Sequence, residues 1–188
     1  MEFDTVTSRI NGARWVPSPN FDDRDEGNQP EVLIIHCISL PPGEYGGGQV
    51  ARFFQNNLPA DEHPYYSSMV HLTVSSHFLI ERCGTLVQFV ATDKRAWHAG
   101  DSSCFERPKV NNFSIGIELE GYDQDPNGYT VPQYQTLAEL TLCLRKAYPS
   151  IKRNSVFSHS DIAPGRKPDP GPYFDWRYYY FILDNLSI

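Results

Sequence analysis

The chain has 188 residues, a length typical of one globular domain, and 40% of them are hydrophobic while 21% are charged. This composition excludes collagen-like, intrinsically disordered and membrane-spanning proteins. The net charge is −7, and no basic run is longer than a pair such as Lys152-Arg153 or Arg166-Lys167. Because an acidic surface repels phosphate groups, we expect no nucleic-acid partner.

The beginning of the chain carries two acids and no apolar run of signal-peptide length, so we expect a cytoplasmic protein without a membrane partner. The four cysteines include no Cys-x-x-Cys pair, which favours reduced thiols over a zinc knuckle or a disulfide scaffold. No repeat or shift of composition divides the sequence. We therefore predict a single domain over residues 1–188, in which residues 1–30 form an irregular lead-in.

Four segments can be assigned in the first part of the chain. The continuous apolar run 32–35 predicts a strand buried on both faces, with His36 at its C-terminal end. Apolar residues at helical spacing predict a helix from about residue 50 that ends at Pro59. Two β-rich runs joined through Gly84 indicate an antiparallel hairpin, and residues 91–112 have no clear period, which predicts a long ordered loop.

The second part contains two strands and two helices. Apolar residues alternate from Phe113 to Gly121, so Glu118 points away from the packed face of the predicted strand. Thr130 and Gln133 have the spacing of a capping box, and the helix that follows ends before Pro149. A short strand near residues 156–157 precedes His159, and an aromatic stripe predicts a terminal helix. The fold class is therefore α/β (α+β).

Two of the six histidines occur in a similar context. His36 and His159 each follow a short apolar strand and each begin an irregular loop, and open α/β sheets bind ligands at that edge. The loop after His159 contains four prolines, so it has little freedom and can hold Lys167 and Asp169 in fixed positions. Asp169 can then approach the two imidazoles.

Two imidazoles and one carboxylate suit zinc, with the fourth position left open for water in a catalytic site. Such water has a pKa of ~7. Hydrolysis also requires a carboxylate that transfers protons and a positive group for the developing oxyanion. Glu118 and Lys167 have the chemistry for these two roles.

The spacing leaves three alternatives open. Glu120 follows Glu118 by two residues and is an equal candidate by alternation alone. The alternative interpretation of Lys167 is that it is an ordinary surface lysine. Asp161 competes with Asp169 as the third ligand, although its position is more typical of a carboxylate that caps a turn.

Five ordered motifs together resemble the AmpD-type 1,6-anhydro-N-acetylmuramoyl-L-alanine amidases, zinc amidases that share a fold with peptidoglycan recognition proteins. The motifs cover nearly the whole chain, and their joint occurrence is far more specific than any one of them. They are Leu33-Ile34-Ile35-His36, Ser76-His77-Phe78-Leu79-Ile80, Arg95-Ala96-Trp97-His98-Ala99-Gly100, the segment 113–121 and the segment 159–172.

The resemblance implies a central mixed β-sheet flanked by helices, with three zinc ligands and two catalytic groups. The zinc ligands are His36, His159 and Asp169, the proton shuttle is Glu118, and the oxyanion is stabilised by Lys167. The resemblance thus favours Glu118 over Glu120 and Asp169 over Asp161.

The remaining candidates are substrate contacts. Cys37 stands where this family often has an asparagine, and a thiol is a much weaker hydrogen-bonding group. Gly165 and Pro168 also depart from the family pattern. Trp97 and His98 are equally compatible with lining the substrate groove and with supporting their own loop. His77 is interpreted as a structural histidine, and His63 and His71 as structural or surface residues.

The resemblance implies a cytosolic enzyme of peptidoglycan recycling that cleaves the amide between 1,6-anhydro-N-acetylmuramic acid and L-alanine, with an indirect effect on β-lactamase induction. We expect Zn²⁺ as cofactor, an anhydro-muropeptide as substrate, and a monomer. One alternative is a non-catalytic module that recognises peptidoglycan fragments, and another is a zinc peptidase that acts on the stem peptide.

Overall fold

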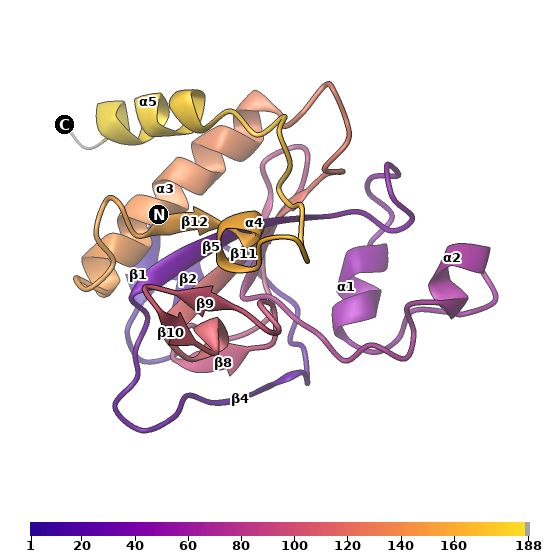
Figure 1. Cartoon of the computed structure of the whole chain (residues 1–188), viewed down its shortest axis with the longest axis horizontal. Coiled ribbons are helices and arrows are strands. Elements are labelled where there is room, and N and C mark those ends of the chain that lie inside the picture. The colour runs from indigo at the N-terminus through magenta and orange to yellow at the C-terminus, as the bar shows by residue number, and fades with distance from the viewer. Residues whose placement is uncertain (187–188) are drawn as a thin grey trace.

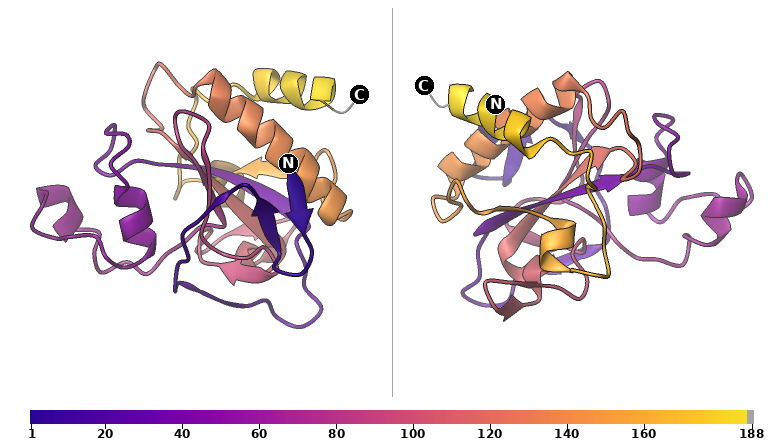
Figure 2. Two further views of the ribbon diagram at one scale, coloured as in Figure 1. Left: turned by 180° about the vertical axis from the view of Figure 1, so that it is seen from behind. Right: turned by 45° about the horizontal axis from the view of Figure 1, so that its top comes forward.

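The computed structural model, shown in Figure 1, describes residues 1–186. At its centre lies a six-stranded sheet, and helices cover one face of it while others project from its side (Figures 1 and 2). The prediction of a mixed sheet flanked by helices is therefore confirmed. In spatial order the strands are β12 (Val156–Ser158), β5 (Val32–Ile38), β11 (Ser114–Glu120), β6 (Phe78–Ile80), β7 (Leu86–Gln88) and β3 (Arg14–Trp15).

The four neighbouring strands β12, β5, β11 and β6 run parallel, so their C-terminal ends meet at one edge. Residues 32–35 of β5 are completely buried, as predicted from their continuous apolar run. His36 pairs with Glu118 across the β5–β11 ladder, and Ser158 pairs with Ile35. His36 on β5 and Glu118 on β11 therefore lie at the same level as His159, which directly follows β12.

The helices α3 (Val131–Ala147) and α5 (Trp176–Leu186) pack on one face of the sheet. The predicted capping box begins α3, because the Thr130 hydroxyl accepts a hydrogen bond from the Gln133 amide while the Gln133 side chain accepts one from the Thr130 amide. Leu137 and Leu144 are fully buried against the sheet. The opposite face of β5 and β11 remains available for the polar residues at the strand ends.

The predicted hairpin is present as the antiparallel pair β6 and β7, with Gly84 at a φ of +87° in the connection. Its strands are shorter than the predicted runs. The helix α1 (Gln49–Phe54) ends earlier than predicted, since Asn56 adopts a left-handed conformation with a φ of +59° and the Asn57 amide bonds back to the carbonyl of Arg52. Together with α2 (Pro64–Ser67), α1 projects from the side of the sheet.

The prediction of an irregular lead-in over residues 1–30 was wrong, and the predicted long ordered loop over residues 91–112 contains short strands. Some of these strands pair with distant segments, as β3 does with β7 and β4 with β8, and others form short local pairs, β1 with β2 and β9 with β10. Strands of two or three residues leave no local periodicity. The further elements are β1 (Glu2–Asp4), β2 (Arg9–Asn11), β4 (Phe21–Asp23), β8 (Lys94–Ala96), β9 (Ser103–Cys104), β10 (Arg107–Pro108) and η1 (Val110–Phe113).

The lead-in also places a cation inside the protein. The Arg24 guanidinium donates hydrogen bonds to the backbone carbonyls of Thr92, Asn111, Asn112 and Ser114, and thereby ties the lead-in to the start of β11. Burial lowers the pKa of Arg24 to about 10, so it stays charged at neutral pH. Within residues 1–186, no helix has the length and apolar character needed to span a membrane.

Candidate active site

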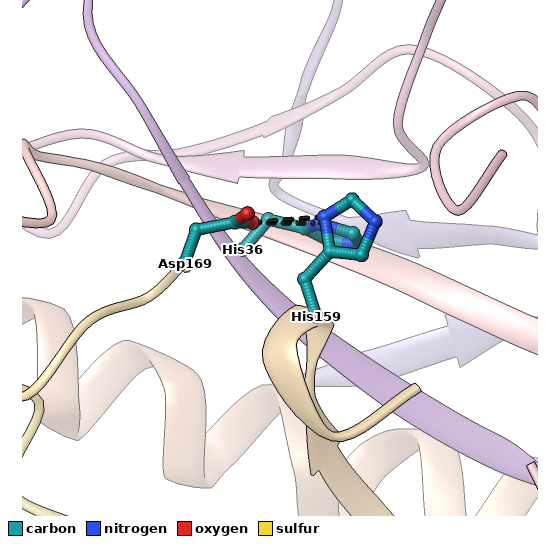
Figure 3. A group of neighbouring side chains, drawn as sticks. All are labelled: His36, His159 and Asp169. Atoms are coloured by element: carbon teal, nitrogen blue, oxygen red, sulfur yellow. Dashed lines mark hydrogen bonds and ion pairs between the residues drawn. The ribbon is translucent and has the colours of Figure 1, made fainter. Parts of the chain in front are cut away.

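Three side chains from distant parts of the chain converge at the C-terminal edge of the sheet (Figure 3). The Nδ1 atoms of His36 and His159 lie 2.9 Å apart. The Oδ2 atom of Asp169 lies 3.1 Å from the first of these nitrogens and 3.0 Å from the second. The three ligands predicted from the sequence are thus brought together, and their metal-binding atoms face one point.

This donor set fits zinc. Zinc bonds of ~2.0–2.1 Å in tetrahedral geometry separate neighbouring ligand atoms by about 3.3 Å, close to the spacings found here. The Nε2–H of His159 donates a hydrogen bond of 3.2 Å to the carbonyl of Ala99, which leaves Nδ1 free to bind a metal. The chemistry and the orientation of these groups agree with a zinc site that keeps one position open.

The protonation of the ligands also suits a cation. Burial lowers the pKa of His36 to about 4, so its imidazole is neutral at neutral pH, as metal binding requires. Burial alone would raise the pKa of Asp169, but its close contacts with the rings of His159 and His36 outweigh burial and hold that pKa well below its usual range. The site therefore combines two imidazoles with one carboxylate.

The alternative ligand Asp161 has another role. The short helix α4 (His159–Ile162) begins at Ser158, whose amide donates a hydrogen bond of 2.8 Å to the Asp161 carboxylate. The Ser158 hydroxyl accepts a reciprocal hydrogen bond of 2.9 Å from the Asp161 amide. Asp161 thus caps the turn that presents His159, as its position in the sequence indicated.

The two candidate carboxylates on β11 differ in their surroundings. Glu118 is 8% exposed beside His36, and its Oε2 has no hydrogen-bond partner among residues 1–186. Burial, reinforced by the negative charge of Asp169, raises the pKa of Glu118 well above its usual range. Glu120 instead accepts hydrogen bonds from the amides of Gly46 and Arg82 and so fixes two loops. Of these two carboxylates, only that of Glu118 has a buried oxygen without a hydrogen-bond partner among residues 1–186.

A cleft of about 420 Å³ opens over the three convergent side chains. Glu118 and Lys167 line its polar end, and Lys167 is solvent-exposed on the proline-rich loop. Trp97 also borders the cleft, while its indole N–H donates a hydrogen bond of 3.1 Å to Asp22. Trp97 therefore supports its own loop and faces the cleft at once. The opposite wall is apolar and includes Leu40, Phe53, Phe54, Tyr65, Met69, Leu72 and Val74.

The other predicted substrate contacts are less exposed. Cys37 borders the cleft, but its side chain packs against the cluster under α3, and burial raises the pKa of its thiol. His98 is 9% exposed and lies behind His36. His77 is confirmed as structural, since it is fully buried, accepts a hydrogen bond from the Gly116 amide and donates one to the Lys94 carbonyl.

Sequence reasoning missed the groups that support the ligands from behind. The carbonyl of Ala99 orients His159, and the hydroxyl of Ser114 lies 3.0 Å from Nε2 of His98. The sequence offered one signal for them: Gly116 interrupts a predicted strand, and a glycine inside a strand marks a place where another group approaches closely.

Known proteins are similar to this chain in both sequence and fold. The profile of the N-acetylmuramoyl-L-alanine amidase family, Amidase_2, matches residues 26–172. The chain is 51% identical over 165 residues to 1,6-anhydro-N-acetylmuramyl-L-alanine amidase AmpD of Escherichia coli K12, with 88% of each chain covered. It superposes with a TM-score of 0.92 on a crystal structure of a selenomethionine derivative of AmpD, at 47% identity over 97% of this chain and 99% of that one.

A more distant solved structure contains a substrate. It is AmiD from Escherichia coli in complex with anhydro-N-acetylmuramic acid-L-Ala-D-γ-Glu-L-Lys, with a TM-score of 0.59 and 26% identity over 87% of this chain and 65% of that one. The prediction of an amidase is confirmed by the family match and by the extent of the similarity. On this evidence the chain belongs to the N-acetylmuramoyl-L-alanine amidase family and, within it, to the AmpD group.

Proposed function

We propose that this protein is a zinc-dependent hydrolase that cleaves the amide bond between 1,6-anhydro-N-acetylmuramic acid and L-alanine in muropeptides. The observation that carries this proposal is the convergence of His36, His159 and Asp169 within 3.1 Å beside the buried, unpaired carboxyl of Glu118. The substrate is proposed from the similarity to AmpD and from the ligand of AmiD.

His36 and His159 would hold the ion through Nδ1, and Asp169 through Oδ2. When bound there, zinc supplies Lewis-acid chemistry and lowers the pKa of a water molecule to ~7. The carboxylate of Asp169 offsets part of the positive charge, and the rigid proline-rich loop keeps it in place. These three side chains therefore supply binding and orientation, while proton transfer falls to another residue.

Glu118 would accept the proton of the attacking water at Oε2 and deliver it to the leaving nitrogen of L-alanine. Its raised pKa favours this role, because a carboxyl with a pKa nearer to neutral takes up and releases a proton with similar ease. The free Oε2 supports the assignment, since no hydrogen bond within residues 1–186 must break before the proton moves.

Lys167 would place its ammonium near the carbonyl oxygen that becomes negative during the attack. A fixed positive charge at that point stabilises the transition state more than the ground state, which is the requirement for catalysis. Trp97 offers an aromatic surface at the cleft for a sugar face, and Cys37 and His98 were predicted to contact substrate as well.

We further propose that the protein acts as a monomer in the cytoplasm on fragments released during peptidoglycan recycling. The similarity to AmpD supports this setting. By removing anhydro-muropeptides, the enzyme would indirectly affect β-lactamase induction.

The test is incubation of the zinc-loaded protein with anhydro-N-acetylmuramyl tripeptide, followed by mass spectrometry. We expect free tripeptide and anhydro-N-acetylmuramic acid. A sugar that retains L-alanine would indicate a peptidase, and binding without products would indicate a recognition module. Elemental analysis of the parent and of His159→Ala then checks the cofactor: we expect about one zinc per parent chain and a large loss in the variant.

A further inference from the structure

His98 lies directly behind one of the metal-binding side chains, and it is only 9% exposed where it borders the cleft. Its Nδ1 is 2.9 Å from Nε2 of His36, and the two rings meet edge to face with centroids 5.0 Å apart. On its other side, Nε2 of His98 is 3.0 Å from the hydroxyl of Ser114. The three side chains therefore form a buried chain of hydrogen bonds that ends at a rotatable hydroxyl.

This chain determines which nitrogen of His36 is free. Metal binding through Nδ1 requires that the proton of the neutral imidazole sits on Nε2. That Nε2–H can then donate to Nδ1 of His98, whose own Nε2–H donates to Ser114. Both nitrogens of His98 and Nε2 of His36 have partners in this arrangement, and the lone pair of His36 Nδ1 faces Asp169 and His159.

Gly116 makes room for His98. A Cβ atom at position 116 would lie 2.5 Å from Cγ of His98 and 2.7 Å from its Cδ2 and Nδ1. Real side-chain contacts are not this close, so any larger residue must displace the imidazole. This requirement explains a glycine in the interior of β11, where glycine otherwise weakens a strand.

The residue after His98 orients the second histidine ligand. The carbonyl of Ala99 accepts the hydrogen bond from His159 Nε2, and the Asn111 side chain accepts hydrogen bonds from the amides of both His98 and Ala99. Two consecutive residues of one loop therefore contact both imidazoles from behind, and a single amide side chain fixes that loop.

We propose that His98 is a positioning residue of the metal site, which holds His36 with Nδ1 directed toward the ion, and that it makes no productive contact with substrate. The inference rests on the zinc site of the proposed function. It assigns His98 a role different from the substrate contact that its sequence motif indicated, and it assigns Gly116 the role of accommodating its ring.

The test compares zinc affinity, measured by competition with a chromophoric chelator at a temperature where every apo variant is folded. We expect His98→Leu to raise the zinc Kd by about 10- to 100-fold, the usual effect of losing an outer-shell partner. His98→Gln, whose amide can accept and donate, should recover much of the affinity. At saturating zinc, KM should stay within about twofold of the parent value.

Two further variants separate positioning from general destabilisation. Leu137→Ala creates a cavity under the opposite face of the sheet, and it should lower thermal stability without changing the zinc Kd. Gly116→Ala should weaken zinc binding although residue 116 is not a ligand. In a His98→Ala background, Gly116→Ala should have no further effect on zinc affinity, because the ring it displaces is gone.

An unchanged zinc Kd in His98→Leu, or a raised KM at saturating zinc, would overturn the inference. Equal losses of zinc affinity in His98→Leu, His98→Gln and Leu137→Ala would show that His98 acts only through packing, and this result would also overturn the inference. Zinc binding and amide cleavage by the parent protein are recorded in the same series. Their absence would refute the proposed function, which the other outcomes leave standing.

Discussion

Replacing Glu118 by glutamine removes the proposed proton carrier with almost no change of shape. General acid–base catalysis contributes typically 10²- to 10⁴-fold to a rate, which corresponds to about 2.7–5.4 kcal/mol of transition-state stabilisation. We therefore expect kcat of Glu118→Gln to fall within that range. Zinc content should be unchanged, because Glu118 is not among the three convergent donors.

The same substitution should make the zinc-free protein more stable at neutral pH. The folded-state pKa of Glu118 is raised above its ordinary value of 4.5, so the folded protein binds this proton more tightly than the unfolded chain does. The free energy of unfolding of the parent consequently falls as the pH rises from about 4.5 toward the folded-state pKa. A glutamine does not titrate, and it matches the protonated carboxyl in shape and in having a hydrogen-bond donor group at one of the two terminal positions.

The assay is thermal or urea unfolding of both proteins in the presence of a chelator between pH 4 and pH 8, alongside kinetics with zinc and the anhydro-muropeptide. The two stabilities should be similar at pH 4, and Glu118→Gln should become the more stable protein as the pH rises. A variant that keeps its activity, or that loses stability at pH 8 together with activity, would refute the reasoning.

Three other substitutions test the remaining assignments. Lys167→Met should lower kcat by about 10²- to 10³-fold, as for loss of one oxyanion-stabilising group, with an unchanged melting temperature because the side chain is exposed; a parent-like kcat would remove Lys167 from the mechanism. Glu120→Ala should destabilise the protein by about 1–3 kcal/mol in urea unfolding, since the amides of Gly46 and Arg82 lose their acceptor, and zinc affinity should persist. Leu137→Ala should cost about 2–5 kcal/mol by the same measurement, and a smaller loss would mean that α3 relaxes into the cavity.

Much of the fold follows from local patterns in the sequence. The run 32–35 predicts a fully buried strand because only a strand covered on both faces tolerates four consecutive aliphatic residues. The Thr130–Gln133 capping box and the apolar spacing that follows predict α3, since both signals lie within one element. The strands of the lead-in could not be predicted in this way, because each is only two or three residues long and β3 and β4 also depend on distant partners.

The same distinction between local and long-range determinants applies to the site. The sequence by itself placed His36 and His159 at the ends of strands and Asp169 on a stiff loop, because these positions depend on local chain direction. Alternation could not separate Glu118 from Glu120, because both lie on one face of β11. Only the tertiary structure showed how their surroundings differ: backbone amides from distant loops occupy the carboxylate of Glu120, whereas Oε2 of Glu118 has no partner among residues 1–186. It also placed His98 against the back of His36, because burial and hydrogen-bond partners are set by segments that meet only in the folded chain.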